Sequence, residues 1–197
     1  EYQINRILDK KIFDNYLLQY KMHNKYVNKN NISEERGCTT HVSVIDKTGN
    51  TASVTTTNGE GCGYFIPGTG IMLNNMLGEE DLNPCGFHQW KKQRRLPTML
   101  SPTIIMKDDV PFMILGSGGS NRIRSAIVQV IINIIYRGMN LKDAIEAPRI
   151  HLEGDILHHE PGIENVSEMA INKYQLNPFK TQNLFFGGVN AVSLSEC

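Results

Sequence analysis

A pair of threonines, Thr39 and Thr40, stands where a charged and polar leader gives way to a stretch of alternating residues. If the peptide bond between Cys38 and Thr39 were cleaved, Thr39 would carry both a nucleophilic hydroxyl and a free α-amine. An α-amine titrates near neutral pH and can act as the general base for the neighbouring hydroxyl. The competing interpretation is structural, because threonine is common where a β-strand begins. These residues alone leave both interpretations open.

A β-hairpin is expected to position this threonine. Residues 40–46 alternate in polarity, residues 47–50 (Lys-Thr-Gly-Asn) have turn chemistry, and residues 51–57 alternate again. Such a hairpin would bring Thr57 back to the level of Thr39. Its hydroxyl could then hydrogen-bond the nucleophile or its amine. The alternative is a cross-strand threonine pair that only stabilises the sheet.

A glycine-rich loop lies downstream, between a predicted strand and a predicted helix, and reads Gly116-Ser117-Gly118-Gly119-Ser120-Asn121-Arg122. A dinucleotide-binding fingerprint requires glycine at position 121 and an acidic residue about 20 positions further on, and neither is present. A phosphate loop would require a Lys-Ser/Thr pair, which is also absent. Consecutive backbone N–H groups at a helix start can instead bind an anion, such as the oxyanion of a tetrahedral intermediate.

An acidic turn at residues 78–84 contains Glu79, Glu80 and Asp81. Such a run of carboxylates is usually solvated surface. In a site for an amino-acid-like substrate, one of them could instead pair with the substrate α-ammonium through a charge-assisted hydrogen bond.

No metal-binding pattern is visible. The six histidines, including the exposed-looking His158-His159 pair, have no ligand spacing, and we expect each to be hydrogen-bonded or solvated. The four cysteines are irregularly spaced and lack a CxxC motif, which argues against zinc. They favour isolated thiols in a reducing compartment, although the location stays open. We expect neither a metal nor a cofactor.

Composition excludes several classes of partner. A chain of 197 residues with 40% hydrophobic and 20% charged residues is typical of one globular domain. Its 20 basic and 20 acidic residues cancel, so we expect no nucleic-acid partner. The longest apolar run, residues 126–136, is too short for a membrane segment.

Periodicity and turn signals predict the remaining elements. Apolar residues at spacings of three and four over residues 1–22 indicate an amphipathic helix or two short ones. Residues 23–36 are polar and charged and are expected to form an exposed linker, which a protease could cut at little structural cost. Glu1 is not an initiator methionine and Cys197 directly follows a predicted strand, so we expect further residues at both ends. Predicted strands cover residues 71–75, 103–107, 111–115, 149–152 and 188–194, and predicted helices cover residues 125–137, 140–147 and 167–174.

Six motifs occur in order along the chain: Thr39-Thr40-His41, Asp46-Lys47-Thr48-Gly49-Asn50, residues 67–75 (PGTGIMLNN), residues 100–104 (LSPTI), residues 116–123 (GSGGSNRI) and Glu146-Ala147-Pro148-Arg149. Together they resemble the small-subunit region of γ-glutamyltransferases. The similarity extends from about Thr39 almost to the C-terminus, whereas residues 1–38 resemble, less specifically, the tail of the large-subunit region.

The resemblance implies an α+β fold, the four-layer αββα sandwich of N-terminal-nucleophile hydrolases. Residues 1–38 would be the large-subunit tail and processing linker, and residues 39–197 the small-subunit catalytic region. The precursor would cut itself between Cys38 and Thr39. Thr39 would then attack glutathione or another γ-glutamyl compound, and the acyl group would pass to water or to an acceptor amine. The implied protein partner is the large-subunit region of the same precursor, which supplies an arginine for the substrate α-carboxylate.

The resemblance also implies roles for individual residues. Thr39 is the nucleophile and Thr57 the hydroxyl that orients it. Glu79 matches the acidic residue that binds the substrate α-ammonium, and the backbone N–H groups of Gly119 and Ser120 match the oxyanion hole.

Five positions differ from the family pattern or fit it less directly. Thr98 and Met99 occupy the place of a serine pair that binds the α-carboxylate, so Met99 replaces a hydroxyl. Ser120 replaces a glycine, and Met76 stands where many members have glutamine. With a short gap in the alignment, Asn58 is a further candidate substrate ligand.

Two other functions remain open. A related acylase that cleaves a glutaryl-like amide would keep Thr39 and the oxyanion loop but would not need Glu79. A non-catalytic relative or fragment of the family would keep the fold without self-cleavage.

Overall fold

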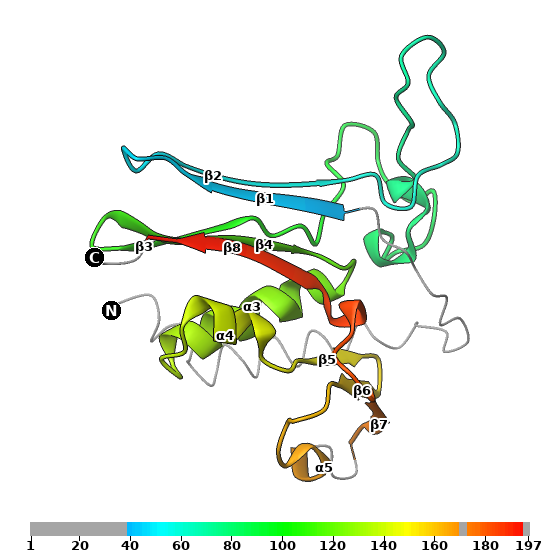
Figure 1. Ribbon diagram of the computed structural model, residues 1–197. Coiled ribbons are helices and arrows are strands. Elements are labelled where there is room, and N and C mark those ends of the chain that lie inside the picture. Colours follow the sequence, from blue (N-terminus) through cyan, green and yellow to red (C-terminus); the bar gives the residue numbers. More distant parts are fainter. Residues whose placement is uncertain (1–38, 170–172, 195–197) are drawn as a thin grey trace. The chain divides into compact units, whose positions relative to one another are not determined.

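The computed structural model describes residues 39–169 and 173–194 (Figure 1). The helix expected within residues 1–22, the linker that follows it and Cys38 lie outside the described residues. In chain order the elements are β1 (Thr39–Ile45), β2 (Thr51–Thr57), η2 (Met76–Gly78), η3 (Glu80–Leu82), β3 (Thr103–Lys107), β4 (Val110–Gly118), α3 (Arg122–Ile135), α4 (Leu141–Glu146), β5 (Ile150–Glu153), β6 (Ile156–His159), α5 (Val166–Met169), β7 (Gln175–Pro178), η4 (Leu184–Phe186) and β8 (Gly188–Ser193).

Strands β1 and β2 form the predicted antiparallel hairpin, with Thr39 opposite Thr57. The turn is held by Asp46, whose Oδ1 accepts hydrogen bonds from the backbone N–H groups of Thr48 and Asn50 at 2.8 and 2.9 Å. Side-chain hydrogen bonds from Asn50 and then Thr48 lower the pKa of Asp46 to about 2. The turn therefore sets a symmetric register that places the two threonines at the same end of the hairpin.

A second sheet has the strand order β3-β4-β8, and all of its neighbouring strands are antiparallel. Its central strand β4 carries the fully buried side chains of Met113, Ile114 and Leu115. Asp108 and Asp109 form the turn before β4, both with positive φ. The three strands predicted for residues 103–107, 111–115 and 188–194 are confirmed.

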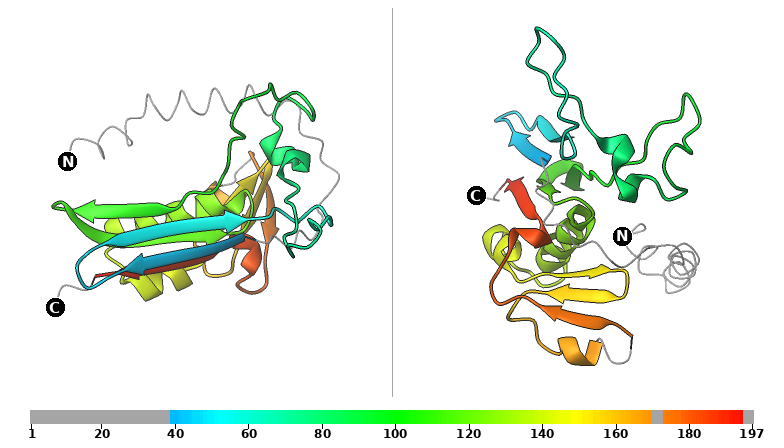
Figure 2. Two further views of the ribbon diagram at one scale, coloured as in Figure 1. Left: turned by 90° about the horizontal axis from the view of Figure 1, so that it is seen from above. Right: turned by 90° about the vertical axis from the view of Figure 1, so that its right-hand side faces the viewer.

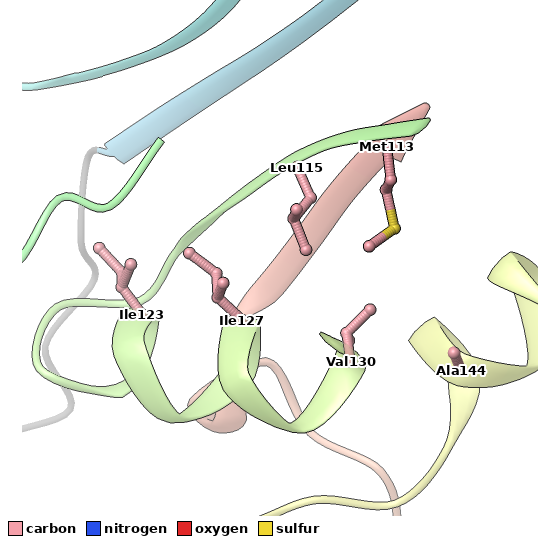
Figure 3. Packing of buried hydrophobic residues seen from close by; sticks show 6 residues of the cluster. All are labelled: Met113, Leu115, Ile123, Ile127, Val130 and Ala144. Atoms are coloured by element: carbon pink, nitrogen blue, oxygen red, sulfur yellow. The ribbon is translucent and has the colours of Figure 1, made fainter. Parts of the chain in front are cut away.

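The hairpin packs on one face of this second sheet, and helices α3 and α4 cover the other (Figures 1 and 2). The main hydrophobic cluster lies between β4 and the two helices (Figure 3), and its buried members are Met113, Leu115, Ile123, Ile127, Val130 and Ala144. The predicted α+β class is confirmed. The described residues contain three of the four expected layers, and the outward valines of the hairpin, Val42, Val44 and Val54, are about half exposed.

Helix α3 begins at Arg122, three residues before the predicted start. Ile123, Ile127 and Val130 repeat at spacings of four and three, so the buried face already starts in the first turn. The first two helical N–H groups, of Arg122 and Ile123, donate to the carbonyls of the glycine-rich loop. The loop and the helix therefore form one continuous unit. No helix among the described residues is long and apolar enough to cross a bilayer.

The segment between β2 and β3 is mostly irregular. The strand predicted for residues 71–75 is wrong, because the described residues there form an isolated bridge between Phe65 and Met72 and a few backbone hydrogen bonds rather than a strand. Ile71 and Leu73 are exposed, so no buried face supports a longer strand. The acidic turn is present as the short helices η2 and η3, which flank Glu79.

The third sheet, β5-β6-β7, was predicted only in part. Strands β6 and β7 were missed. Of the helix predicted for residues 167–174, the described residues contain α5, and residues 173 and 174, just before β7, are not helical; residues 170–172 lie outside the described residues. Strand β7 pairs in parallel with β6, a non-local contact that local periodicity does not report. This pairing buries His158, which is only 4% exposed, contrary to the exposed pair predicted.

His151 lies opposite His158 in this sheet and is 8% exposed. Its Nδ1 lies 2.9 Å from Ser125 Oγ, but its buried Nε2 has no hydrogen-bond partner among the described residues. The prediction that each histidine is hydrogen-bonded or solvated therefore holds for His151 at Nδ1 and not at Nε2. Burial lowers the pKa of His151 from 6.5 to about 4.

Acid is expected to weaken the fold through this residue. Because the pKa in the folded state is depressed, the unfolded state takes up a proton first, and stability is lost as pH falls from about 6.5 towards 4. The full effect is about 3 kcal/mol. Urea unfolding at pH 7.5 and pH 4.5 should show a smaller pH dependence for His151→Leu than for the unchanged protein. Equal losses of stability in the two proteins would contradict this prediction.

Candidate active site

The centre of the candidate site is the pair of hydroxyls at the open end of the hairpin. Thr39 Oγ1 donates a hydrogen bond to Thr57 Oγ1 at 3.1 Å. Thr57 Oγ1 also accepts the backbone N–H of Gly59 at 3.0 Å. These two contacts fix the rotamer of Thr57 and hold the Thr39 hydroxyl at the edge of the sheet. Thr39 is half-buried, so a hydroxyl there remains reachable from solvent.

The Glu79 carboxylate lies against Gly59, the residue whose N–H binds Thr57 Oγ1. A Cβ added at Gly59 would lie 2.1 Å from Glu79 Oε1 and 2.1 Å from Asn75 Oδ1. Asn75 Oδ1 accepts the backbone N–H of Glu60 at 2.8 Å, which anchors the loop beneath the carboxylate. Gly59 therefore contacts both the Thr57 hydroxyl, through its N–H, and the Glu79 carboxylate, although Thr57 and Glu79 are 22 positions apart in the sequence.

The glycine-rich loop lies against the other side of Thr39. A Cβ added at Gly118 would lie 3.0 Å from the Thr39 carbonyl oxygen. Gly119 and Ser120 follow immediately, with φ of 124° and 53°. Neither of their N–H groups donates in the backbone hydrogen-bond network of the described residues. Two successive backbone donors are therefore available next to the candidate nucleophile, the arrangement an oxyanion hole requires.

Ser120 occupies a left-handed backbone conformation that favours glycine. We expect Ser120→Gly to raise the free energy of unfolding by about 1 kcal/mol, because glycine removes the steric cost of the positive φ. Turnover should be retained, since the loop contributes a backbone N–H. Urea unfolding measures the first effect and initial rates the second.

Ser120→Ala is the matched control for this prediction, because it deletes the hydroxyl but keeps the Cβ. It should gain no stability. If the alanine variant were as stable as the glycine variant, backbone strain at position 120 would not be the cause.

The remaining predicted ligands lie at different places. Thr98 is exposed, and its Oγ1 accepts the backbone N–H of Leu100 at 3.1 Å, which leaves its hydroxyl proton available. Met99 packs against the main hydrophobic cluster. Asn58 Nδ2 donates to the Met72 carbonyl at 3.3 Å, so its amide group also braces the loop.

Sequence reasoning missed a group that supports the oxyanion loop from behind. A Cβ added at Gly119 would lie 2.8 Å from Gly187 Cα. The Gly187 carbonyl accepts a hydrogen bond from Arg149 Nη1 at 3.1 Å. Arg149 is buried, and its backbone N–H donates to Glu160 Oε2, while Glu160 Oε1 accepts the N–H of Asn183. In the sequence, the Glu146–Arg149 motif shared with γ-glutamyltransferases is the one signal that points to this region.

His41 was also missed as part of the site. It lies two residues after Thr39, on the same face of β1, and is 8% exposed. Burial lowers its pKa, which favours the neutral form of the ring. Alternation along β1 could have placed it next to the nucleophile.

Among the described residues, no group of three or more His, Cys, Asp or Glu side chains is arranged to hold a metal ion.

Comparisons with known proteins agree with this geometry. The family model for gamma-glutamyltranspeptidase matches residues 2–196. The glutathione hydrolase proenzyme of Bacillus subtilis strain 168 is 35% identical over 163 residues, covering 81% of this chain and 28% of that protein. The acylase ACY 1 proenzyme of Pseudomonas sp. strain SE83 is 33% identical over 163 residues, covering 82% and 29%. The chain thus spans less than a third of the length of these relatives.

The crystal structure of the γ-glutamyltranspeptidase of Helicobacter pylori has a similar fold. It is 32% identical and superposes with a TM-score of 0.66, covering 78% of this chain and 90% of the crystallised chain. Proteins with this structure are N-terminal-nucleophile hydrolases, which confirms the predicted fold class. The match of the family model over nearly the whole sequence shows that this chain belongs to the γ-glutamyltranspeptidase family.

Proposed function

We propose that this chain carries the nucleophile of an enzyme that transfers or hydrolyses γ-glutamyl groups, with glutathione and related compounds as donors. The observation that supports it best is the Thr39–Thr57 hydroxyl pair, with the Glu79 carboxylate against the neighbouring Gly59 and the glycine-rich loop against Thr39. In this proposal residues 39–197 form the small-subunit catalytic region and residues 1–38 the tail of the large-subunit region.

Self-cleavage comes first in the proposed sequence of reactions. Thr39 Oγ1 attacks the carbonyl carbon of Cys38, and the acyl group moves from the Thr39 nitrogen to its oxygen as an ester. Water then hydrolyses this ester, leaving a carboxylate on Cys38 and a free α-amine on Thr39. The contact with Thr57 holds the attacking hydroxyl in one rotamer while this happens.

The freed amine then serves as the base for turnover. It takes the proton of Thr39 Oγ1 as that oxygen bonds to the γ-carbonyl carbon of the donor. The negative oxygen of the tetrahedral intermediate accepts the N–H groups of Gly119 and Ser120. When the carbon–nitrogen bond breaks, the ammonium of Thr39 returns the proton to the departing amine. Water or an acceptor amine next attacks the ester and releases Thr39.

Recognition of the γ-glutamyl group is assigned to charged and polar groups at the two sides of the site. Glu79 would pair with the substrate α-ammonium, a charge-assisted contact. The Thr98 hydroxyl, whose proton is available, would donate to the α-carboxylate together with the backbone of Met99. Asn58 is assigned a supporting role in the same loop. The large-subunit region of the precursor would supply the arginine that completes the carboxylate site.

A related acylase is the second candidate function, which the 33% identity to the acylase ACY 1 proenzyme supports. A glutaryl group has no α-amine, so its enzyme has no use for a carboxylate at position 79. The position of Glu79 beside Gly59 is therefore the feature that favours γ-glutamyl donors.

A pair of chromogenic anilides tests the proposal on the full-length protein. We expect release of the aniline from a γ-glutamyl anilide at a kcat/KM at least about 100-fold higher than from the glutaryl anilide, which lacks the α-ammonium. Preference for the glutaryl compound would identify an acylase. A chain that never yields a fragment beginning at Thr39 by mass spectrometry, and that cleaves neither anilide, would be a non-catalytic relative.

A further inference from the structure

The space between the hairpin and the second sheet is lined by polar side chains along β1. His41 is the largest of them and both of its ring nitrogens are engaged. Nδ1 lies 2.7 Å from Thr55 Oγ1, on the paired strand, and Nε2 lies 2.8 Å from Ser43 Oγ. The ring therefore cannot rotate without losing two hydrogen bonds inside a buried space. The two hydrogen bonds hold the imidazole in one orientation between the two sheets.

The partner of this ring on the second sheet is a glycine. A Cβ added at Gly116 would lie 2.2 Å from both Cε1 and Nδ1 of His41. Real Cβ atoms do not approach other atoms so closely, so the imidazole rests directly on the backbone of β4. Gly116 is buried and has an ordinary φ, which means that its lack of a side chain serves the close approach rather than a turn.

The contact between His41 and Gly116 lies two residues from Thr39 along β1 and two residues from Gly118 along β4. Thr39 is the inward residue that precedes His41 on β1, and Gly116 is followed two residues later by Gly118, which lies against Thr39. Gly118 leads directly into the donors of Gly119 and Ser120. The separation of the two sheets at His41 therefore sets the distance from Thr39 Oγ1 to the oxyanion loop.

We propose that His41 is a positioning residue that acts as a spacer: its imidazole, seated on Gly116 and held by Thr55 and Ser43, fixes the gap between the nucleophile and the oxyanion loop. The ring does not touch substrate and transfers no proton. The inference rests on the proposed function, because it assigns His41 a role in the same acyl transfer. Displacements of about 1 Å in such geometry can lower turnover about 100-fold.

A double-mutant cycle on the full-length protein tests the spacer. His41→Ala empties the gap, and Gly116→Ala forces the ring and β4 apart. Each single variant should lower kcat for the γ-glutamyl anilide by at least about 10-fold while KM changes less than about 3-fold, because Glu79 and Thr98 are untouched. In the double variant the new methyl group enters the space left by the ring, so its kcat should exceed that of both single variants.

The matched control is His88→Ala, which removes an exposed imidazole from a surface loop and should leave kcat unchanged. All rates are measured well below the unfolding midpoint of each variant. His41→Ala with kcat within about 2-fold of the unchanged protein, or a double variant no better than the worse single variant, would overturn the proposal.

The same cycle in urea unfolding separates this inference from the proposed function. A favourable coupling between positions 41 and 116 in the free energy of unfolding is expected whether or not the protein acts on γ-glutamyl donors. Absent turnover in the unchanged protein would reject the proposed function alone. Additive stability effects would reject the spacer even in an active enzyme.

Discussion

Thr39→Ala is expected to leave the precursor in one piece and to lower γ-glutamyl anilide turnover by at least about 10³-fold. The variant lacks the oxygen that attacks the Cys38 carbonyl and, after cleavage, the donor γ-carbonyl. The hydrogen bond to Thr57 is lost as well, but the rest of the hairpin pairing is unaffected. Mass spectrometry of the purified protein and initial-rate assays measure the two effects.

Two neighbouring substitutions serve as controls for this result. Thr39→Ser keeps both a hydroxyl and, after cleavage, an α-amine, so it should still process and turn over, at reduced rates. Thr40→Ala removes an exposed hydroxyl from the opposite face of β1 and should behave as the unchanged protein. Turnover by uncleaved Thr39→Ala at the normal rate would refute the assignment of the nucleophile.

Glu79→Gln is expected to raise KM for the γ-glutamyl anilide by about 30- to 100-fold, with a much smaller change in kcat. The substitution keeps the shape of the side chain but removes the charge that would pair with the α-ammonium, a contact of about 2–3 kcal/mol. For the glutaryl anilide, which has no ammonium, the same variant should carry no penalty. Steady-state kinetics with both substrates measure this contrast.

Glu80→Gln is the matched control, because Glu80 is the exposed neighbour in the same acidic turn. It should leave KM unchanged for both anilides. An unchanged KM for Glu79→Gln with the γ-glutamyl substrate would remove Glu79 from the binding site and reopen the acylase interpretation.

Local signals were sufficient for the parts of the site that are close in sequence. Alternation on both sides of an Asp-Lys-Thr-Gly-Asn turn predicted the hairpin, and equal strand lengths placed Thr57 opposite Thr39. The glycine-rich loop before an amphipathic segment predicted backbone donors at a helix start. In the structure, helix α3 starts at Arg122 rather than at residue 125, because its buried face begins before its most apolar run.

Contacts between distant segments were beyond local reasoning. Strands β6 and β7 escaped prediction because they pair in parallel, a contact between segments that are distant in sequence. The burial of His158 follows from that pairing. In the same way, nothing near Gly187 in the sequence indicates that Arg149 holds its carbonyl behind the oxyanion loop.

The amino-acid sequence by itself determined the family, the hairpin with its threonine pair and the candidate residues, because these depend on local alternation, turn chemistry and motifs. Only the tertiary structure decided which candidates lie together: Glu79 approaches the hydroxyl pair through Gly59, and His41 rests on Gly116. The physical reason is that both contacts require one chain segment to approach another within van der Waals distance. Such approach depends on how whole layers pack, which local patterns do not encode.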